Sequence, residues 1–270
     1  MNQDHRPVAP AAPAAGYIGG KRNLSRRLIE RIDRIPHDGY AEAFVGMGGV
    51  FLRRSRQPRF EAINDRSGDV ATFFRILQRH YTHFMEMLRF QISSRREFDR
   101  LTATDPDTLT DLERAARFLY LQRLAFGGKV AGRTFGVDPA QGARFNVTKL
   151  APILEAIHER LAGVVIERLD WSEFLRRYDR PGMLFYLDPP YYGSEGDYGK
   201  DAFGRDQFAL LADRLRTLRG SFLLSINDRP EVREVFAGLS METAETTYTV
   251  GRKDPVRVGE LIITGPSIPL

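Results

Sequence analysis

Residues 40–49 read Tyr-Ala-Glu-Ala-Phe-Val-Gly-Met-Gly-Gly (YAEAFVGMGG), and this stretch decides the fold class. Residues 40–46 are expected to form a strand that runs into a glycine-rich turn, and residues 59–64 (RFEAIN) a second strand that ends at Asp65. Two strands joined by a helical crossover pair in parallel. The sequence therefore predicts an α/β protein with a Rossmann-like sheet.

Further along the chain, strand patterns return after a long interruption. Apolar stretches predict strands over 164–169, 183–187, 221–226, 242–250 and 260–264. A crossover helix between two of them is indicated by apolar residues at helical spacing, namely Phe208, Leu211, Ala212 and Leu215. These elements extend the sheet predicted from residues 40–64.

The interruption itself is mostly helical. Val70, Phe73, Phe74 and Leu77 lie at helical spacing, and the pair Thr110 and Glu113 has the spacing of a capping box. Residues 125–145 are rich in glycine and basic residues and are expected to form a loop or an irregular hairpin. We therefore expect an inserted, mostly helical subdomain over 67–150, with the sheet domain formed by 16–66 and 151–270.

Composition indicates a soluble protein. Of the 270 residues, 42% are hydrophobic and 28% charged, and no apolar run is long enough to span a membrane. Residues 1–15 are rich in proline and alanine, without the apolar core of a secretion signal, and are expected to form a disordered tail. The absence of cysteine excludes disulfides and a cysteine nucleophile, and fits a cytoplasmic location.

The chain is basic, with a formal net charge of +5. Lysine and arginine side chains that neutralise phosphates release condensed counterions, so this charge is compatible with a nucleic-acid partner. It is equally compatible with an ordinary solvated surface.

The motif Asp188-Pro189-Pro190-Tyr191 directly follows the apolar strand predicted over 183–187. Open α/β sheets bind their ligands at this end of a strand. The Asp188 carboxylate and the Pro189 carbonyl can together accept both hydrogens of a planar amino group, and Tyr191 adds an aromatic face for a base. A proline-stiffened turn with a core tyrosine is the alternative interpretation.

The glycine-rich turn points to a nucleotide. Gly46 and Gly48 let the backbone approach a ligand closely, and Asp65 stands at the tip of the next strand, where a carboxylate accepts from ribose hydroxyls. This pattern predicts an adenosine-containing cofactor. It does not distinguish such a cofactor from NAD.

Together these motifs resemble the Dam-type adenine-specific DNA methyltransferases over essentially the whole chain after the first residues. The resemblance lies in four motifs, in this order: Gly19-Gly20-Lys21, Phe44-Val45-Gly46-Met47-Gly48, Asn64-Asp65 and Asp188-Pro189-Pro190-Tyr191. It implies an S-adenosylmethionine-dependent methyltransferase sheet with the target adenine held by Asp188, Pro189, Pro190 and Tyr191. The implied cofactor site is lined by Tyr17, Lys21, Phe44, Gly46, Gly48 and Asp65.

The resemblance also places Asp170, followed by Trp171, against the cofactor's adenine, although Asp170 is equally suited to cap a surface helix with Ser172. It implies that the inserted subdomain recognises the target in double-stranded DNA. The candidate DNA-binding residues are Arg123, Lys129, Arg133 and Arg144. The alternative is a charged loop whose interleaved aromatic residues, Phe126, Phe135 and Phe145, pack on the subdomain.

The expected reaction is methyl transfer to N6 of an adenine that is flipped out of the duplex, without a metal ion, in a monomeric enzyme from a bacterium or a phage. Cytosine N4 is a chemically similar amino group, and only the order of the other motifs favours adenine. Three alternatives remain: a methyltransferase acting on RNA or a protein amide, a DNA-binding module without activity, and a nicotinamide-dependent oxidoreductase.

Overall fold

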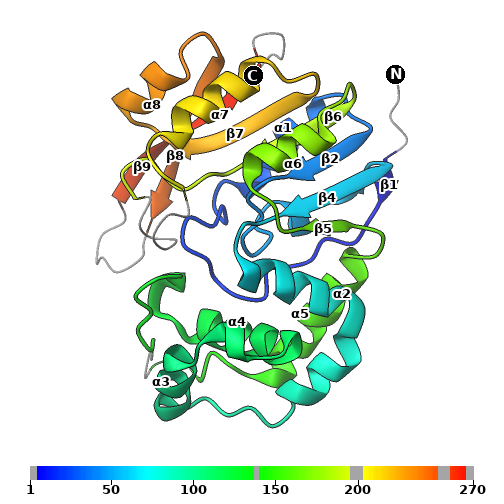
Figure 1. Cartoon of the computed structure of the whole chain (residues 1–270), viewed down its shortest axis with the longest axis vertical. Coiled ribbons are helices and arrows are strands. Elements are labelled where there is room, and N and C mark those ends of the chain that lie inside the picture. The colour runs from blue at the N-terminus through cyan, green and yellow to red at the C-terminus, as the bar shows by residue number, and fades with distance from the viewer. Residues whose placement is uncertain (1–4, 137–139, 141, 195–202, 249–255, 266–270) are drawn as a thin grey trace.

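The computed structural model describes residues 5–136, 140, 142–194, 203–248 and 256–265 (Figure 1). Its centre is a seven-stranded sheet in the order β5-β4-β2-β6-β7-β9-β8. The strands are β2 (Gly39–Glu42), β4 (Phe60–Asn64), β5 (Val165–Glu167), β6 (Met183–Leu187), β7 (Ser221–Asn227), β8 (Ser240–Tyr248) and β9 (Val256–Thr264). The first five are parallel, and β9 runs antiparallel to both of its neighbours. This order confirms the predicted α/β, Rossmann-like fold.

The chain builds the sheet outward in both directions from β2, so the topological switch point lies between the carboxyl ends of β2 and β6. Glu42 ends β2, and Asp188 directly follows β6. The fold therefore places the Asp188 motif at the position where doubly wound sheets bind ligands.

Alternate residues of each strand supply two separate cores. On β6, Leu184 and Tyr186 face the core shared with α1 (Ser25–Arg34). Phe185 and Leu187 face the core shared with α6 (Trp171–Tyr178), α7 (Gln207–Arg216) and α8 (Pro230–Val235). Helices therefore cover both faces of the sheet, as the near-continuous apolar character of β6 requires.

The predicted helical crossover between β2 and β4 is wrong. The connection contains only turns, the 3-10 helix η1 (Phe51–Arg53) and the two-residue strand β3 (Arg56–Gln57). Gly46 and Gly48 adopt positive φ angles of 50° and 75°. A right-handed helix cannot continue through such residues, so the glycine-rich segment forms a tight loop instead.

A helical layer lies against the β5 end of the sheet (Figure 1). Its elements are α2 (Gly68–Leu88), α3 (Arg95–Ala103), η2 (Pro106–Thr108), α4 (Asp111–Leu124), η3 (Phe126–Gly128) and α5 (Val147–Arg160). The Thr110–Glu113 capping box forms as predicted. The predicted boundary at residue 150 falls inside α5, and Arg160 at the end of α5 binds Glu61 of β4 through two hydrogen bonds of 2.7 and 2.9 Å.

The predicted disordered tail is also wrong for residues 5–15, the part that the structure describes. Strand β1 (Arg6–Pro7) pairs with β3, and Ala11 and Ala14 are buried. The Ala11 amide donates to the Leu52 carbonyl at 2.8 Å. Small alanine side chains let this segment pack closely on η1, a role that composition does not distinguish from disorder.

Two further expectations fall partly outside the described residues. Residues 249–250 of the strand predicted over 242–250 are not described, and neither are 137–139 and 141 of the segment 125–145. In the described part of that segment, one bridge between Ala125 and Phe135 joins the two sides of an otherwise irregular loop. No helix in the described part of the chain is both long and apolar enough to cross a membrane.

Candidate active site

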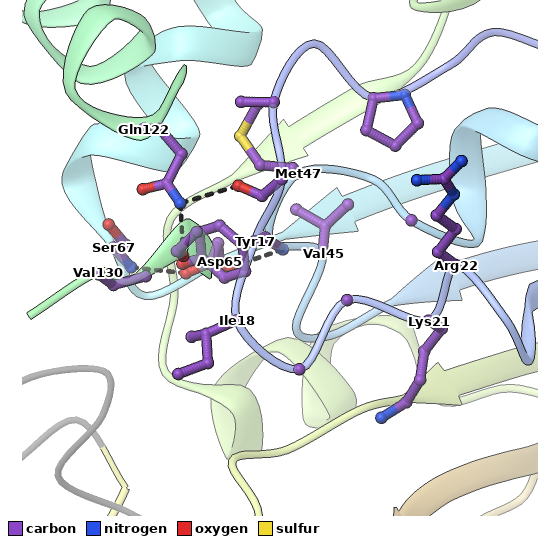
Figure 2. A pocket seen from close by; sticks show the side chains of 18 of the residues that line it. Tyr17, Ile18, Lys21, Arg22, Val45, Met47, Asp65, Ser67, Gln122 and Val130 are labelled. Atoms are coloured by element: carbon purple, nitrogen blue, oxygen red, sulfur yellow. Dashed lines mark hydrogen bonds between the residues drawn. The ribbon is translucent and has the colours of Figure 1, made fainter. Parts of the chain in front are cut away.

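A cleft of about 1610 Å³ opens where the carboxyl ends of the strands meet the helical layer. The N-terminal loop over 15–22 forms one wall, and the glycine-rich loop over 42–50 forms the floor. Figure 2 shows Asp65 and Tyr17 in the middle of this pocket, with Gln122 reaching in from α4 and Lys21 on the opposite side. Segments that are far apart in the sequence and that belong to both layers therefore build one site.

Asp65 is held by the backbone of the loops beside it. Its Oδ2 accepts from the Gly46 amide and its Oδ1 from the Ser67 amide, each at 2.9 Å. Burial raises the pKa of Asp65 to about 6, although these two hydrogen bonds oppose the shift. A Cβ at Gly46 would lie 3.0 Å from the Tyr17 ring, so only glycine permits this close approach. The structure thus brings Tyr17, Gly46 and Asp65 together.

The other candidate cofactor residues have different surroundings. Phe44 lines the cleft, with its ring 5.8 Å from that of Phe203. Gly48 lies behind the loop, where a Cβ would come within 2.7 Å of Leu52, so its role is to permit the turn. Asp170 caps α6 through Ser172, and Leu169 and Trp171 line the cleft on either side of it.

Asp188 lies at the switch point beside a lysine from the N-terminal loop. Its Oδ1 is 2.8 Å from Lys21 Nζ and accepts from Ser225 Oγ at 3.1 Å. Burial raises the pKa of Asp188 to about 6, and Lys21 limits the rise. Both contacts use Oδ1, so Oδ2 can accept a hydrogen bond from a ligand.

The hydroxyl of Tyr191 is fixed by two partners. Lys21 Nζ donates to it at 2.9 Å, and it donates in turn to Oε1 of Glu260. Glu260 is fully buried on β9, and its Oε2 lies 3.4 Å from Lys21 Nζ. These contacts set the orientation of the Tyr191 ring. The sequence predicts Glu260 only as the first residue of a strand and does not indicate that it belongs to the site.

Strand β7 holds the motif from the other side. Ser225 bonds Asp188, and the Asn227 side chain bonds both the amide and the carbonyl of Tyr192, at 2.9 and 3.0 Å. Residues two apart on a strand share a face, which is why both reach the same turn. The sequence offered a signal for these residues, because they are the polar positions at period two in the apolar strand SFLLSIN.

Glu42 lies at the base of the cleft and is 2% exposed. Burial raises its pKa to about 8, and the nearby Asp188 charge adds to the rise. The Tyr40 hydroxyl donates to it at 2.8 Å. The raised pKa favours the protonated form of Glu42, which would reduce the negative charge beside Asp188.

The four candidate DNA-binding residues separate into two pairs. Arg123 donates to the carbonyls of Ala14 and Arg144, and Arg133 is largely enclosed and donates to Gln122. Lys129 is exposed, whereas Arg144 is partly exposed, as Arg123 and Arg133 are, and both Arg123 and Arg144 line the cleft. The hydrogen bonds of Arg123 and Arg133 connect parts of the protein, and they distinguish this pair from Lys129 and Arg144.

Gln122 is a further residue that sequence reasoning missed. It is buried on α4, and its Nε2 donates to the carbonyls of Gly16 and Gly128 at 2.9 and 2.7 Å. One amide thus joins the N-terminal loop to the helical layer. Phe135 and Phe145 pack on Phe98 and Tyr120, as the alternative interpretation of the loop expects, while Phe126 is 47% exposed.

Comparison with known proteins gives one family. The model of the D12 class N6 adenine-specific DNA methyltransferases matches residues 17–250. The chain is 22% identical over 256 residues to the Type II methyltransferase M.CviBI of Paramecium bursaria Chlorella virus NC1A, covering 93% of this chain and 96% of that one. It is 24% identical to the Type II methyltransferase M1.LlaDCHI of Lactococcus lactis subsp. cremoris, covering 93% and 94%.

A solved structure that the chain matches is the precorrin 8w decarboxylase of Methanobacterium thermoautotrophicum. The match has a TM-score of 0.41 and 13% identity, and it covers 90% of this chain and 89% of that one.

Proposed function

This chain belongs to the D12 class N6 adenine-specific DNA methyltransferase family, and from that premise we propose that its cleft binds S-adenosylmethionine next to a flipped adenine. The protein is a site-specific adenine DNA methyltransferase. The observation that carries the proposal is the position of Asp188, at the switch point, with Oδ1 held by Lys21 and Ser225.

The residues around the glycine-rich loop fit the proposed cofactor. Asp65 has one backbone donor on each oxygen, so both oxygens retain capacity to accept from the two ribose hydroxyls. Gly46 lets the Tyr17 ring lie close against the backbone of the loop that binds Asp65. When bound, S-adenosylmethionine supplies a methyl group on a positively charged sulfur. Tyr17, Lys21 and Phe44 complete the proposed site, and Gly48 and Asp170 shape the loops that carry it.

The target adenine would be held by its amino group. Asp188 Oδ2 and the Pro189 carbonyl would accept its two hydrogens, which fixes the amino group so that its lone pair, perpendicular to the base plane, is directed at the methyl group. Tyr191 offers its face to the base while its hydroxyl stays fixed by Lys21 and Glu260. Pro190 keeps the turn rigid.

The chemical contribution of these residues is positioning and charge. The amino nitrogen is conjugated to the ring and is a poor nucleophile, so its orientation supplies much of the acceleration. Positive charge develops on the nitrogen during transfer, and the Asp188 carboxylate stabilises it. Asp188 would also accept the proton that the nitrogen must release, and its raised pKa suits that task.

We further propose that the helical layer reads the DNA sequence. It forms one wall of the cleft, and it carries the accessible Lys129 and Arg144. Arg123 and Arg133 would act through the shape of the loop over 125–145, since their guanidinium groups bond within the protein. Phosphate contacts position a protein on DNA, and base contacts select the sequence.

A product analysis tests the proposal. The purified protein is incubated with methyl-labelled S-adenosylmethionine and unmethylated double-stranded DNA, and the DNA is digested to nucleosides. Labelled N6-methyldeoxyadenosine is expected. Label on cytosine N4 would keep the amino-group clamp but contradict the base assignment. Binding of the cofactor without any labelled DNA would contradict the proposed arrangement of the site.

A further inference from the structure

An exposed apolar segment lies at the junction of α2 and α3. Met87, Phe90 and Ile92 are 38%, 82% and 69% exposed, and they fall within six residues of one another. Exposed apolar side chains that cluster in this way commonly mark an interaction surface. The proposed methyl transfer uses none of these residues.

The backbone of this segment is anchored. The Tyr120 hydroxyl donates to the Ile92 carbonyl and accepts from the Ser94 amide, both at 3.0 Å. Ser93 Oγ donates to the Phe145 carbonyl at 3.0 Å. The backbone around Ile92 is therefore held in place, with the Ile92 side chain exposed on the surface.

Basic residues surround the apolar ones. Arg89, Arg95 and Arg96 are exposed, and within the described ranges none of them forms an ion pair. The Arg89 guanidinium lies 5.3 Å from the centre of the Phe90 ring, and that of Arg95 lies 4.8 Å from the centre of the Phe135 ring. This combination of positive charge and apolar tips is complementary to a nucleic-acid groove, where phosphates flank sugars and bases.

The segment is also continuous with the proposed DNA-reading loop. Phe145, which accepts from Ser93, lines the cleft, and Phe135, beside Arg95, belongs to the same loop over 125–145. In Figure 1 the connection from α2 follows the lower edge of the helical layer and reaches α3 on the side of this loop. A duplex held at the cleft can thus extend along this surface.

We infer that residues 87–96 form a second DNA contact beside the target site. Arg89, Arg95 and Arg96 bind backbone phosphates, while Phe90 and Ile92 press against sugars and base edges of the flanking duplex. The inference rests on the proposed role of the helical layer in DNA binding. It adds a contact outside the loop over 125–145 and outside the cleft.

The absence of cysteine from the chain allows a direct test. Ile92→Cys introduces a single thiol in the segment, and Leu210→Cys introduces a matched control on α7, where the native leucine is 54% exposed. The rate of thiol alkylation is measured in the full chain with and without an unmethylated duplex carrying the target site. Bound DNA should slow alkylation of the Ile92→Cys protein by about tenfold and leave the control unchanged, because thiol reactivity requires access.

A salt titration gives a second readout. Replacing either Arg95 or Arg96 with glutamine should reduce the slope of log affinity against log salt by about 0.9 if that arginine neutralises one phosphate. Arg176→Gln on α6, where the arginine is 70% exposed and pairs with Glu173, also removes one positive charge, but from the sheet layer, and should leave the slope unchanged. A slope unchanged in the Arg95 and Arg96 variants would overturn the assignment of these arginines to phosphates.

The outcomes separate this inference from the proposed function. DNA that binds the Ile92→Cys protein without slowing its alkylation would overturn only the second contact. No DNA binding by the unmodified chain would overturn both. Protection that grows with protein concentration in the absence of DNA would identify a second copy of the chain as the occupant and would also overturn the assignment.

Discussion

Lys21 Nζ lies 2.8 Å from Asp188 Oδ1, so the loop before α1 supplies the counter-ion of the residue proposed to hold the target amino group. The same ammonium group also binds the Tyr191 hydroxyl. One side chain from near the start of the chain therefore orients two residues of the motif that follows β6.

Replacing Asp188 with asparagine should abolish most methyl transfer. The amide keeps the shape but loses the charge that stabilises the developing positive nitrogen, so the rate should fall by at least about a hundredfold. S-adenosylmethionine binding, measured by calorimetry, should change little. An Asp188→Asn enzyme with near-normal turnover would contradict the proposed mechanism.

Lys21→Met should move the acid limb of the pH–rate profile. Asp188 must be ionised to act, and its pKa of about 6 predicts activity that falls as the pH drops through that value. Lys21 lowers this pKa, so its removal should shift the limb upward by about one pH unit or more. Arg26→Met, which removes an exposed charge on α1, serves as the control and should leave the profile in place.

Asp65→Asn should weaken cofactor binding by about tenfold or more, because the variant cannot offer a charged acceptor to the ribose hydroxyls. The maximal rate at saturating cofactor should stay close to that of the native enzyme. Asp170→Asn is the matched variant: asparagine still caps α6, so cofactor affinity should be nearly unchanged if capping is the role of this residue. A decrease comparable to that of Asp65→Asn would instead place the Asp170 carboxylate on the cofactor.

Lys129→Gln should affect DNA binding, whereas Arg133→Gln should chiefly affect stability. Lys129 is exposed, so its replacement should lower the salt dependence of DNA binding by about 0.9 in slope if it contacts one phosphate. Arg133 bonds Gln122 inside the helical layer, and its replacement should chiefly lower the melting temperature. Equal salt slopes for Lys129→Gln and the native enzyme would remove Lys129 from the interface.

Glu42→Gln should change how stability depends on pH. The folded-state pKa of Glu42 is about 8, above its value in the unfolded chain, so the folded state binds the extra proton between these two values. The contribution of Glu42 to the free energy of unfolding is fully present below the pKa of this residue in the unfolded chain. It declines as the pH rises towards 8, by up to about 1.4 kcal/mol per pH unit. Denaturant titrations from pH 5 to 8 should show a shallower decline in the variant, and parallel curves would contradict the raised pKa.

The sheet and the motifs at its carboxyl edge could be predicted from the sequence because both are local. The run Met183–Leu187 is apolar throughout, as a strand buried on both faces must be, and its end fixes the position of Asp188. The capping box of α4 likewise depends only on Thr110 and Glu113.

What could not be predicted depends on contacts between distant segments. Glu260 becomes a site residue only because β9 inserts between β7 and β8, and nothing near it in the chain indicates Lys21 as its partner. Arg123 and Arg133 are of the residue type that most often contacts DNA. Their hydrogen bonds inside the protein are visible only in the folded structure. The alanines of the N-terminal segment are buried for the same long-range reason.

The position of β9 bears on the order in which the enzyme becomes active during its synthesis. Lys21 and the Asp188 motif leave the ribosome before the strand that carries Glu260, which fills the gap between β7 and β8. Until that strand arrives, Tyr191 lacks the Glu260 carboxylate as an acceptor and Lys21 lacks the same carboxylate as a neighbour. A chain in which β9 has not yet been made or inserted is thus expected to have an incompletely fixed active site, and full competence to methylate DNA would be reached only after β9 has joined the sheet.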